Sequence, residues 1–371
     1  MSFSIVLLFS VCKNTKIFIT FATNTLNYYI MRKISLFFSV LCLLMCMACS
    51  SNRGNEFFIP KAIWPDTDGN HINAHGGGIL YHEGTYYWYG EYKVGETVLP
   101  EWASWECYRT EVTGVSCYSS KDLLNWKFEG IVLPAVPDDP THDLHPSQVV
   151  ERPKVIYNPA TKKFVMWIHM DSADYNKAAA GVAVADSPTG PFVYQGSFRP
   201  NDSMSRDQTL FVDDDGTAYQ FSSSEHNATL HINRLTPDFL KPDGTFVRRF
   251  IDQSREAPAV FKHNGKYYML SSGCTGWDPN QAEIAVADSI MGEWTVLGNP
   301  CTGPDADKTY YGQSTYVIPI NPEKGLFIAC LDRWNKTDLQ DSRYIWLPLV
   351  FDGDKPQVIW KEQWNLAEFG E

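Results

Sequence analysis

The sequence predicts an all-β fold, a five-bladed β-propeller, and three observations support this prediction. The chain beyond its first sixty residues shows almost no helical periodicity and consists of short apolar and aromatic runs separated by Gly, Asn, Asp and Pro turns. One pattern recurs five times: a polar residue, an apolar strand, a tight turn and an aromatic strand. The polar residues of its last four copies, at positions 151, 207, 256 and 313, are spaced by 56, 49 and 57 residues. A period of about 50 residues with four strands per unit is typical of a β-propeller.

The five copies follow one another along the chain, each with hairpin chemistry at its centre. They are AHGGGILYHEGTYYWYGE (74–91), ERPKVIYNPATKKFVMWIHMD (151–171), RDQTLFVDDDGTAYQFSSSE (206–225), REAPAVFKHNGKYYMLSSG (255–273) and GQSTYVIPINPEKGLFIACLDRW (312–334). The segments SSKDLLNW, ADSPTGPF and ADSIMGEW each follow a further apolar strand and precede another, so that each unit supplies about four strands. An irregular β-sandwich is the alternative, but it does not explain five copies.

In the first and second copies the corresponding polar residues, His75 and Glu151, are 76 residues apart, because two polar stretches are inserted between the copies. One is the Trp-rich segment ETVLPEWASWECYRTEV, which contains Trp102 and Trp105. We expect this insertion to shape the surroundings of any binding site.

The N-terminal region is expected to be processing sequence. Met31-Arg32-Lys33 is a charged start, and ISLFFSVLCLLMCMA (34–48) is an apolar run of signal-peptide length. Cys49, which follows Ala48, resembles the lipidated cysteine of a bacterial lipobox. A transmembrane anchor is the alternative, but the run is short for a membrane span.

These features predict three regions. Residues 1–48 would be a mis-assigned start plus a lipoprotein signal peptide, with Met31 as the expected true start. Residues 49–59 would be a short linker after lipidated Cys49, and residues 60–371 would be the propeller domain. The expected location is the bacterial cell envelope, facing the periplasm or on the outer-membrane surface, with the lipid anchor as the membrane contact.

Charge and cysteine content exclude several classes of function. The formal net charge is −12, and removal of residues 1–48, which hold four basic and no acidic residues, changes it to about −16. Such a chain repels nucleic acid and anionic polymers, so a neutral substrate is expected. After removal of residues 1–48, the chain contains no CxxC pair and no His/Cys cluster that would indicate a zinc site. Cys107 and Cys117 could form a disulfide, but burial as small apolar residues is the favoured interpretation.

One polar residue precedes the innermost strand of each predicted blade at the same relative position. The five are His75, Glu151, Asp207, Glu256 and Gln313. Because innermost strands line the channel of a propeller, these side chains should surround one pocket. Carboxylates around a channel are compatible with a bound cation, but nothing in the sequence requires a metal or another cofactor.

The set fits a glycosidase better. Glycosidic cleavage needs a protonated carboxyl that protonates the leaving oxygen and a second group that directs water or attacks the sugar. Glu256, next to Pro258 and an apolar strand, is the best candidate for the acid, since partial burial and a nearby carboxylate both raise a carboxyl pKa. Asp207, one blade away, would supply that carboxylate and orient the acid.

At this point the chain resembles glycoside hydrolase family 43, over about residues 60–371. That resemblance implies a five-bladed inverting enzyme in which an Asp before the third inner strand tunes the acid and a Glu before the fourth is the general acid. SRDQTLF and REAPAVF match those positions as Asp207 and Glu256.

The chain departs from the family pattern at the first blade, where INAHGGGILY lacks the Asp that usually acts as base. AHGGG, YYWYGE, ERPKV, SGCTGW and GQST together resemble the exo-β-1,3-galactanase subgroup. That resemblance implies that Gln313 directs water in place of the missing base, with Glu151 as a supporting or alternative base.

The same resemblance implies sugar-binding roles for Glu91, Tyr175, Thr275 and Trp277. Trp277 is suited to stack on galactose, although it could be an ordinary blade-edge aromatic, and Glu91 could face either the pocket or solvent. Glu225 is a further candidate from its place on the third blade. His75 could contact substrate or pack in the channel mouth beside three glycines.

The predicted function is therefore an inverting exo-glycosidase that releases galactose from β-1,3-galactan, such as the arabinogalactan backbone, with a neutral plant-type polysaccharide or oligosaccharide as its partner. An α-L-arabinofuranosidase on the same fold is the enzymatic alternative. A non-catalytic glycan-binding lipoprotein is the alternative from another class, and the missing base is the argument for it.

Overall fold

The computed structural model describes residues 4–10, 16–22 and 54–371. Strands β1 (Ser4–Ser10) and β2 (Lys16–Ala22) pair antiparallel within a unit of residues 1–53, and residues 54–371 form a second compact unit. The predicted signal segment 31–48 and Cys49 lie outside the described residues. No helix within the described ranges is long and apolar enough to cross a membrane.

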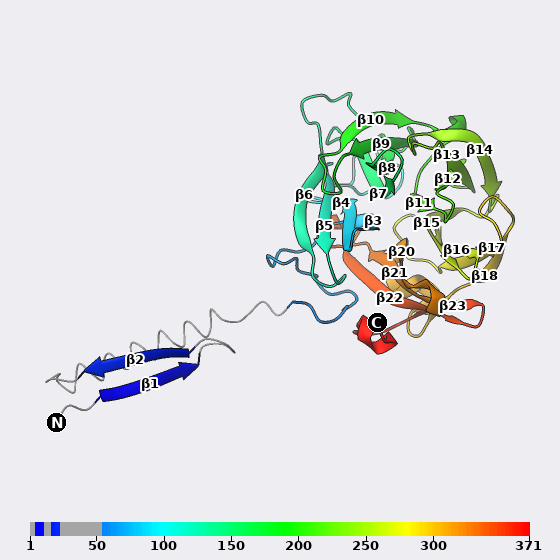
Figure 1. The fold of residues 1–371 in the computed structure, drawn as a ribbon. Helices are drawn as coiled ribbons and strands as arrows, with labels where there is room; N and C mark the ends of the chain where they lie inside the picture. The colour runs from blue at the N-terminus through cyan, green and yellow to red at the C-terminus, as the bar shows by residue number, and fades with distance from the viewer. Residues whose placement is uncertain (1–3, 11–15, 23–53) are drawn as a thin grey trace. The chain divides into compact units, whose positions relative to one another are not determined.

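Residues 54–371 form a five-bladed β-propeller, as the repeats predict (Figure 1). Each blade is an antiparallel sheet whose strands run in sequence order from the channel outward. The first blade consists of β3 (His75–His82), β4 (Thr85–Glu91), β5 (Gly114–Ser120) and β6 (Lys127–Pro134), and the second of β7 (Val149–Asn158), β8 (Lys163–Asp171), β9 (Ala179–Ala185) and β10 (Val193–Phe198). The third consists of β11 (Gln208–Val212), β12 (Ala218–Ser224), β13 (Thr229–Leu235) and β14 (Pro242–Arg249), and the fourth of β15 (Arg255–His263), β16 (Lys266–Gly273), β17 (Glu283–Ala287) and β18 (Trp294–Gly298). The fifth consists of β20 (Gln313–Asn321), β21 (Leu326–Arg333), β22 (Arg343–Asp352) and β23 (Lys355–Ile359). A short strand, β19 (Cys301–Thr302), adds to the outer edge of the fifth blade by pairing parallel to β23.

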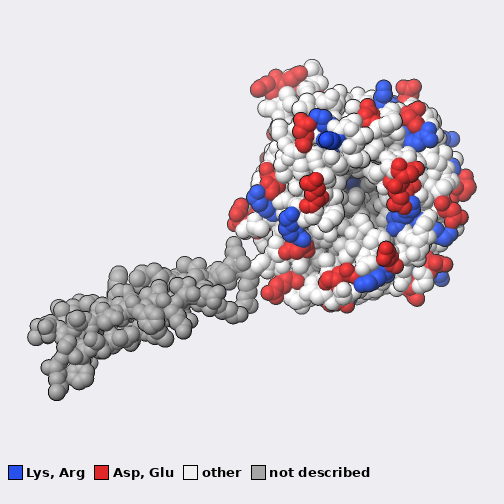
Figure 2. All heavy atoms as spheres, viewed as in Figure 1, with Lys and Arg blue, Asp and Glu red and all other residues white. Residues whose placement is uncertain are grey.

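The innermost strands close a ring around the channel. β3 contacts β7, β7 contacts β11, β11 contacts β15, β15 contacts β20, and β20 contacts β3. A separate buried cluster of apolar side chains fills each of the five interfaces between neighbouring blades. The core is therefore divided among the blade interfaces, which leaves the channel mouth available for polar groups. The face turned to the viewer in Figure 2 is hollowed at its centre and carries interspersed acidic and basic side chains.

The segment before β3 closes the ring between the first and fifth blades. Phe58 forms an isolated bridge with Trp364 and packs on Trp346, and the Tyr344 hydroxyl accepts the N–H of Ala74 at 2.8 Å. Residues 54–59, which we expected to belong to a linker, are thus part of the propeller unit, because burial of Phe58 completes this interface.

The described cysteines after residue 53 are all free thiols. Cys107 and Cys117 are both buried, which agrees with their interpretation as small apolar side chains.

Replacement of Trp346 by alanine is expected to lower the free energy of unfolding by about 3–5 kcal/mol, because it opens a cavity in the first–fifth blade interface. Chemical denaturation of the variant and the parent measures this difference. Trp102→Ala, at a tryptophan that is 55% exposed, is the control and should change stability by less than about 0.5 kcal/mol. Equal losses in the two variants would contradict the importance assigned to this interface.

Candidate active site

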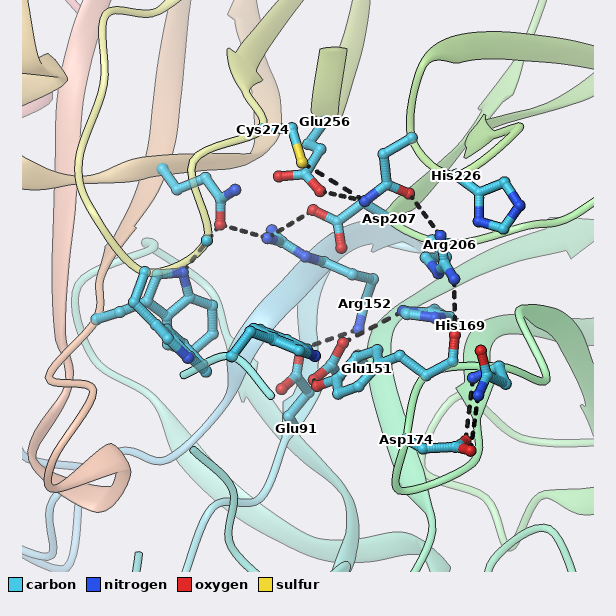
Figure 3. A pocket seen from close by; sticks show the side chains of 18 of the residues that line it. Glu91, Glu151, Arg152, His169, Asp174, Arg206, Asp207, His226, Glu256 and Cys274 are labelled. Atoms are coloured by element: carbon cyan, nitrogen blue, oxygen red, sulfur yellow. Dashed lines mark hydrogen bonds and ion pairs between the residues drawn. The ribbon is translucent and has the colours of Figure 1, made fainter. Parts of the chain in front are cut away.

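The starts of the innermost strands open into a pocket of about 440 Å³. Four of the five residues that the repeat pattern singled out line it: Glu151, Asp207, Glu256 and Gln313. Figure 3 labels Glu151, Asp207 and Glu256, whose side chains converge on this pocket from separate blades.

Bulges in the inner strands turn two of these side chains into the pocket. The pairing register shifts just after Glu151 in β7 and just after Glu256 in β15. The next residue in each case, Arg152 or Ala257, has a left-handed backbone with φ of 52° or 51°. Because a bulge bends its strand and redirects the side chain, it lifts the carboxyl group from the blade interface toward the channel mouth.

Arg152 lies at the centre of the pocket floor and is 5% exposed. Its Nη2 forms an ion pair with Asp207 Oδ2 at 2.9 Å and donates to Gln313 Oε1 at 2.5 Å, and its Nη1 donates to the Ser314 carbonyl at 3.1 Å. Its backbone N–H donates to Glu91 Oε1 at 2.9 Å. Arg152 therefore connects the second blade with the third and fifth through its guanidinium and with the first through its backbone N–H.

Glu256 has the properties of a general acid. Burial, followed by the negative charge of Asp207, raises its pKa to about 7. Its Oε1 accepts a hydrogen bond from Asn227 Nδ2 at 2.7 Å, and the Cys274 thiol lies beside it. A carboxyl with this pKa keeps its proton in mildly acidic solution and can deliver it to a leaving group.

Glu151 is held in the opposite charge state. Burial opposes its ionisation, but His169, whose Nδ1 lies 3.2 Å from Glu151 Oε2, outweighs burial and holds the pKa at about 2. The Tyr175 hydroxyl donates to Glu151 Oε1 at 2.8 Å. Burial lowers the pKa of His169, but its hydrogen bonds to Asp171 and Glu151 raise it to about 10. The pocket thus contains an ionised Glu151 and, two blades away, Glu256, which holds its proton up to near neutral pH.

Gln313 has a fixed orientation. Its Oε1 accepts from Arg152 Nη2 and from Trp334 Nε1, the latter at 3.0 Å, and its Nε2 donates to Ser272 Oγ at 3.0 Å. The two donors on its oxygen and the acceptor of its nitrogen hold the amide in one orientation. This fixed orientation is the feature that suits Gln313 to hold a water molecule by hydrogen bonding.

Three loops from different blades close one side of the pocket. Trp277 Nε1 donates to the Glu106 carbonyl at 2.6 Å, and the Glu106 carboxylate binds Lys336 Nζ at 2.6 Å. Trp277 also packs edge-on against Trp334, and Trp105 against Tyr175, with ring centroids 5.7 and 5.3 Å apart. The aromatic wall is therefore held in place by the inserted loop of the first blade.

Of the predicted sugar-binding residues, Glu91, Tyr175 and Trp277 line the pocket. The Glu91 carboxylate is 2% exposed and is paired with Lys93 Nζ at 2.8 Å, so its contacts are within the protein. Burial raises the pKa of Glu91, although the charge of Lys93 opposes this.

The structure places three further candidates outside the pocket lining. His75 is fully buried and stacks on Tyr344, 4.9 Å between ring centroids, which leaves it no surface for substrate. The Glu225 carboxylate turns to the outer strands, where it binds Arg248, because left-handed backbone at that residue directs it away from the channel. Thr275 lies in the rim loop, and its hydroxyl donates to the Asp278 carbonyl at 2.6 Å.

Several pocket residues were missed by the sequence analysis. They are Lys93, Arg152, His169, Arg206, Asn227, Cys274 and Trp334. Arg152 follows directly after a predicted site residue, and the bulge that brings it into the pocket has no clear sequence signal. Arg206 directly precedes another predicted site residue, Asp207, and the remaining ones lie in later strands or loops, outside the recurring position.

Among the described residues, Glu151, His169 and Asp207 offer atoms that lie within 4.8 Å of one another, as metal ligands would. Arg152 already neutralises Asp207, and His169 is protonated between two carboxylates, whereas a metal ligand must be a neutral imidazole. The geometry of this cluster fits the guanidinium and the imidazolium better than a metal ion.

Glycoside hydrolases use a protonated carboxyl group together with nearby carboxylates, and this pocket at the mouth of the propeller channel contains both. The chain belongs to glycosyl hydrolases family 43, whose family model matches residues 78–332. The protein is therefore a glycoside hydrolase. The search of curated proteins returned no match.

Several solved structures are similar to this chain. The family 43 β-1,3-galactosidase BT3683, solved with galactodeoxynojirimycin, is 44% identical with a TM-score of 0.77, and the match covers 83% of this chain and 100% of the relative. The β-1,3-galactosidase BT0265 is 41% identical with a TM-score of 0.77, covering 85% of this chain and 64% of that one, slightly less than two thirds of its length. An exo-β-1,3-galactanase from Phanerochaete chrysosporium, solved with β-1,3-galactotriose, is 35% identical with a TM-score of 0.74, covering 84% and 68%.

The pH dependence of hydrolysis should report the ionisation of Glu256. Activity on an unactivated glycoside is expected to fall as the pH rises through about 7, because the acid then loses its proton. Asp207→Asn removes a negative charge that raises the pKa of Glu256, so the alkaline limb of the profile should move to lower pH. Profiles of kcat/KM for both proteins test this, and an unmoved or upward-shifted limb in the variant would contradict it.

Proposed function

We propose that the protein is an inverting exo-glycosidase that hydrolyses β-1,3-linked galactan, including the arabinogalactan backbone, and releases galactose. The observation that carries the proposal is the pairing of protonated Glu256 with Gln313 on neighbouring inner strands, while His75 occupies the first-blade position where the family pattern has an Asp. The similarity to β-1,3-galactosidases and an exo-β-1,3-galactanase supports the choice of sugar and linkage.

In the proposed reaction, Glu256 gives its proton to the glycosidic oxygen as the bond from that oxygen to the anomeric carbon breaks. Asp207 holds the acid near its working pKa, and Arg152 fixes Asp207 in place. Water attacks the opposite face of the sugar ring in the same step, which inverts the anomeric configuration.

The water is directed by Gln313, with Glu151 in support. Arg152 and Trp334 donate to the Gln313 oxygen and fix the amide, which orients the attacking water by hydrogen bonding, and the proton that this water loses passes to the Glu151 carboxylate. Glu151 stays ionised, so it can accept hydrogen bonds from sugar hydroxyls and from water, but with a pKa of about 2 it is a weak base by itself.

The exo mode of action is supported by the closed side of the pocket. The inserted loop (96–112) is tied through Glu106 to Trp277 and Lys336, so a long polymer cannot lie across this side. A pocket closed at one end accepts the terminal sugar of a chain, and the Trp277 indole would pack on its apolar face.

An α-L-arabinofuranosidase remains the second enzymatic candidate, since its site would use the same acid and modulator. The Gln313 arrangement in place of a first-blade carboxylate favours galactan. A purely glycan-binding protein would not need a carboxyl with the raised pKa of Glu256. No metal is proposed in the reaction, and the lipid anchor at Cys49 and the location in the cell envelope are proposals from the sequence.

Purified protein on debranched β-1,3-galactan is expected to release galactose alone from the start, first as the α-anomer when followed by proton NMR. Glu256→Gln should lower this activity by at least about a hundredfold, since general acid catalysis contributes that much on poor leaving groups. Release of arabinose from an arabinofuranoside panel instead would replace galactan as the substrate. A β-anomer as first product would contradict inversion, and undiminished activity of the variant would contradict the acid assignment.

A further inference from the structure

Asn227 lies in the turn between β12 and β13 and contacts both Glu256 and Arg206, which Figure 3 labels. Its Nδ2 donates to Glu256 Oε1 at 2.7 Å and lies 3.7 Å from Cys274 Sγ. Its Oδ1 accepts from Arg206 Nη1 at 3.2 Å. Each polar atom of the amide therefore has a partner.

The orientation of this amide follows from the chemistry of its neighbour. A guanidinium can only donate hydrogen bonds, so the amide oxygen of Asn227 must face Arg206 and the amide nitrogen must face Glu256. Arg206 is itself held by the Tyr175 carbonyl, which accepts from Nη2 at 2.6 Å, and by Asp171, whose Oδ2 lies 3.6 Å from Nε. The amide is thus prevented from flipping.

The fixed amide makes the two oxygens of Glu256 different. The N–H of Asn227 requires an acceptor, so protonation of Oε1 would compete with that hydrogen bond, whereas protonation of Oε2 leaves it intact. We propose that Asn227 is a positioning residue that places the transferable proton of Glu256 on Oε2, the oxygen that meets the leaving group. This inference rests on the proposed acid role of Glu256.

The proton balance of the step is simple. The O–H bond at Oε2 breaks, the proton joins the glycosidic oxygen, and the electron pair of the broken glycosidic bond stays on that oxygen. Glu256 is left as a carboxylate, and the Asn227 N–H then stabilises the new negative charge next to Asp207.

The turn that carries Asn227 is held in an unusual conformation. Glu225, His226 and Asn227 have consecutive positive φ values of 52°, 56° and 66°. Arg248 and His231 bind the Glu225 carboxylate and hold the start of this turn. Backbone of this kind persists only where surrounding contacts stabilise it, and here it delivers the Asn227 amide to Glu256. Glu225 therefore supports the pocket indirectly, by holding the turn that carries Asn227, and does not contact the sugar itself.

Two variants remove the donor while respecting the backbone. Asn227→Gly suits the positive φ and deletes the amide, and Asn227→Asp keeps the shape but has no N–H to donate. Each is measured on a β-1,3-linked galacto-oligosaccharide and on 2,4-dinitrophenyl β-galactoside, whose leaving group needs no proton. We expect kcat on the oligosaccharide to fall about thirtyfold with KM within about twofold, and kcat on the aryl galactoside to stay within about threefold.

Asn264→Gly is the matched control, because Asn264 also has positive φ (49°) but sits at the hairpin turn of β15, at the far end of that strand from Glu256. It should keep parent kinetics on both substrates. In Asn227→Asp the added negative charge should also move the alkaline limb of the pH profile upward.

Glu256→Gln separates failure of this inference from failure of the proposed function. If Glu256→Gln shows no selective loss on the oligosaccharide, the acid assignment itself fails. If Glu256→Gln does show it, but the Asn227 variants lose activity equally on both substrates or on neither, the positioning role is overturned while the acid remains.

Discussion

The organisation of the pocket depends on the buried guanidinium of Arg152. It contacts Asp207 and Gln313 from two other blades, and its backbone N–H holds Glu91 from a third. A buried cation of this kind is tolerated only where hydrogen bonds and opposite charge surround it, and removal of one partner is costly. The ring closure of the propeller and the geometry of the active site are therefore linked through one side chain on a bulge in β7.

That arrangement allows carboxyl groups in one pocket to differ in charge. His169 keeps Glu151 ionised, whereas burial and the charge of Asp207 keep Glu256 protonated near neutral pH. Arg152 is paired with Asp207 and not with Glu256, so its charge lowers the pKa of Glu256 less than burial and the charge of Asp207 raise it. Separate environments for carboxyl groups are the general means by which one fold supports acid chemistry at neutral pH.

The fold and the ring of site residues could be predicted because both follow from a local pattern repeated every 50 or so residues. The polar residue before each inner strand marked Glu151, Asp207, Glu256 and Gln313, and all four line the pocket. His75 occupies the same position but is buried against Tyr344, a fifth-blade residue whose proximity only the closed ring creates. Arg152 and Asn227 depend on left-handed backbone at non-glycine residues, which leaves no periodic signal in a sequence.

A carbon-13 NMR titration of the Glu256 carboxyl group, assigned by comparison with Glu256→Gln, tests the central claim most directly. The account predicts a pKa of about 7 in the unliganded protein, well above the ordinary glutamate value of 4.5. A pKa at or below 4.5 would mean that the group is ionised at neutral pH, has no proton to give, and is not the acid of this enzyme.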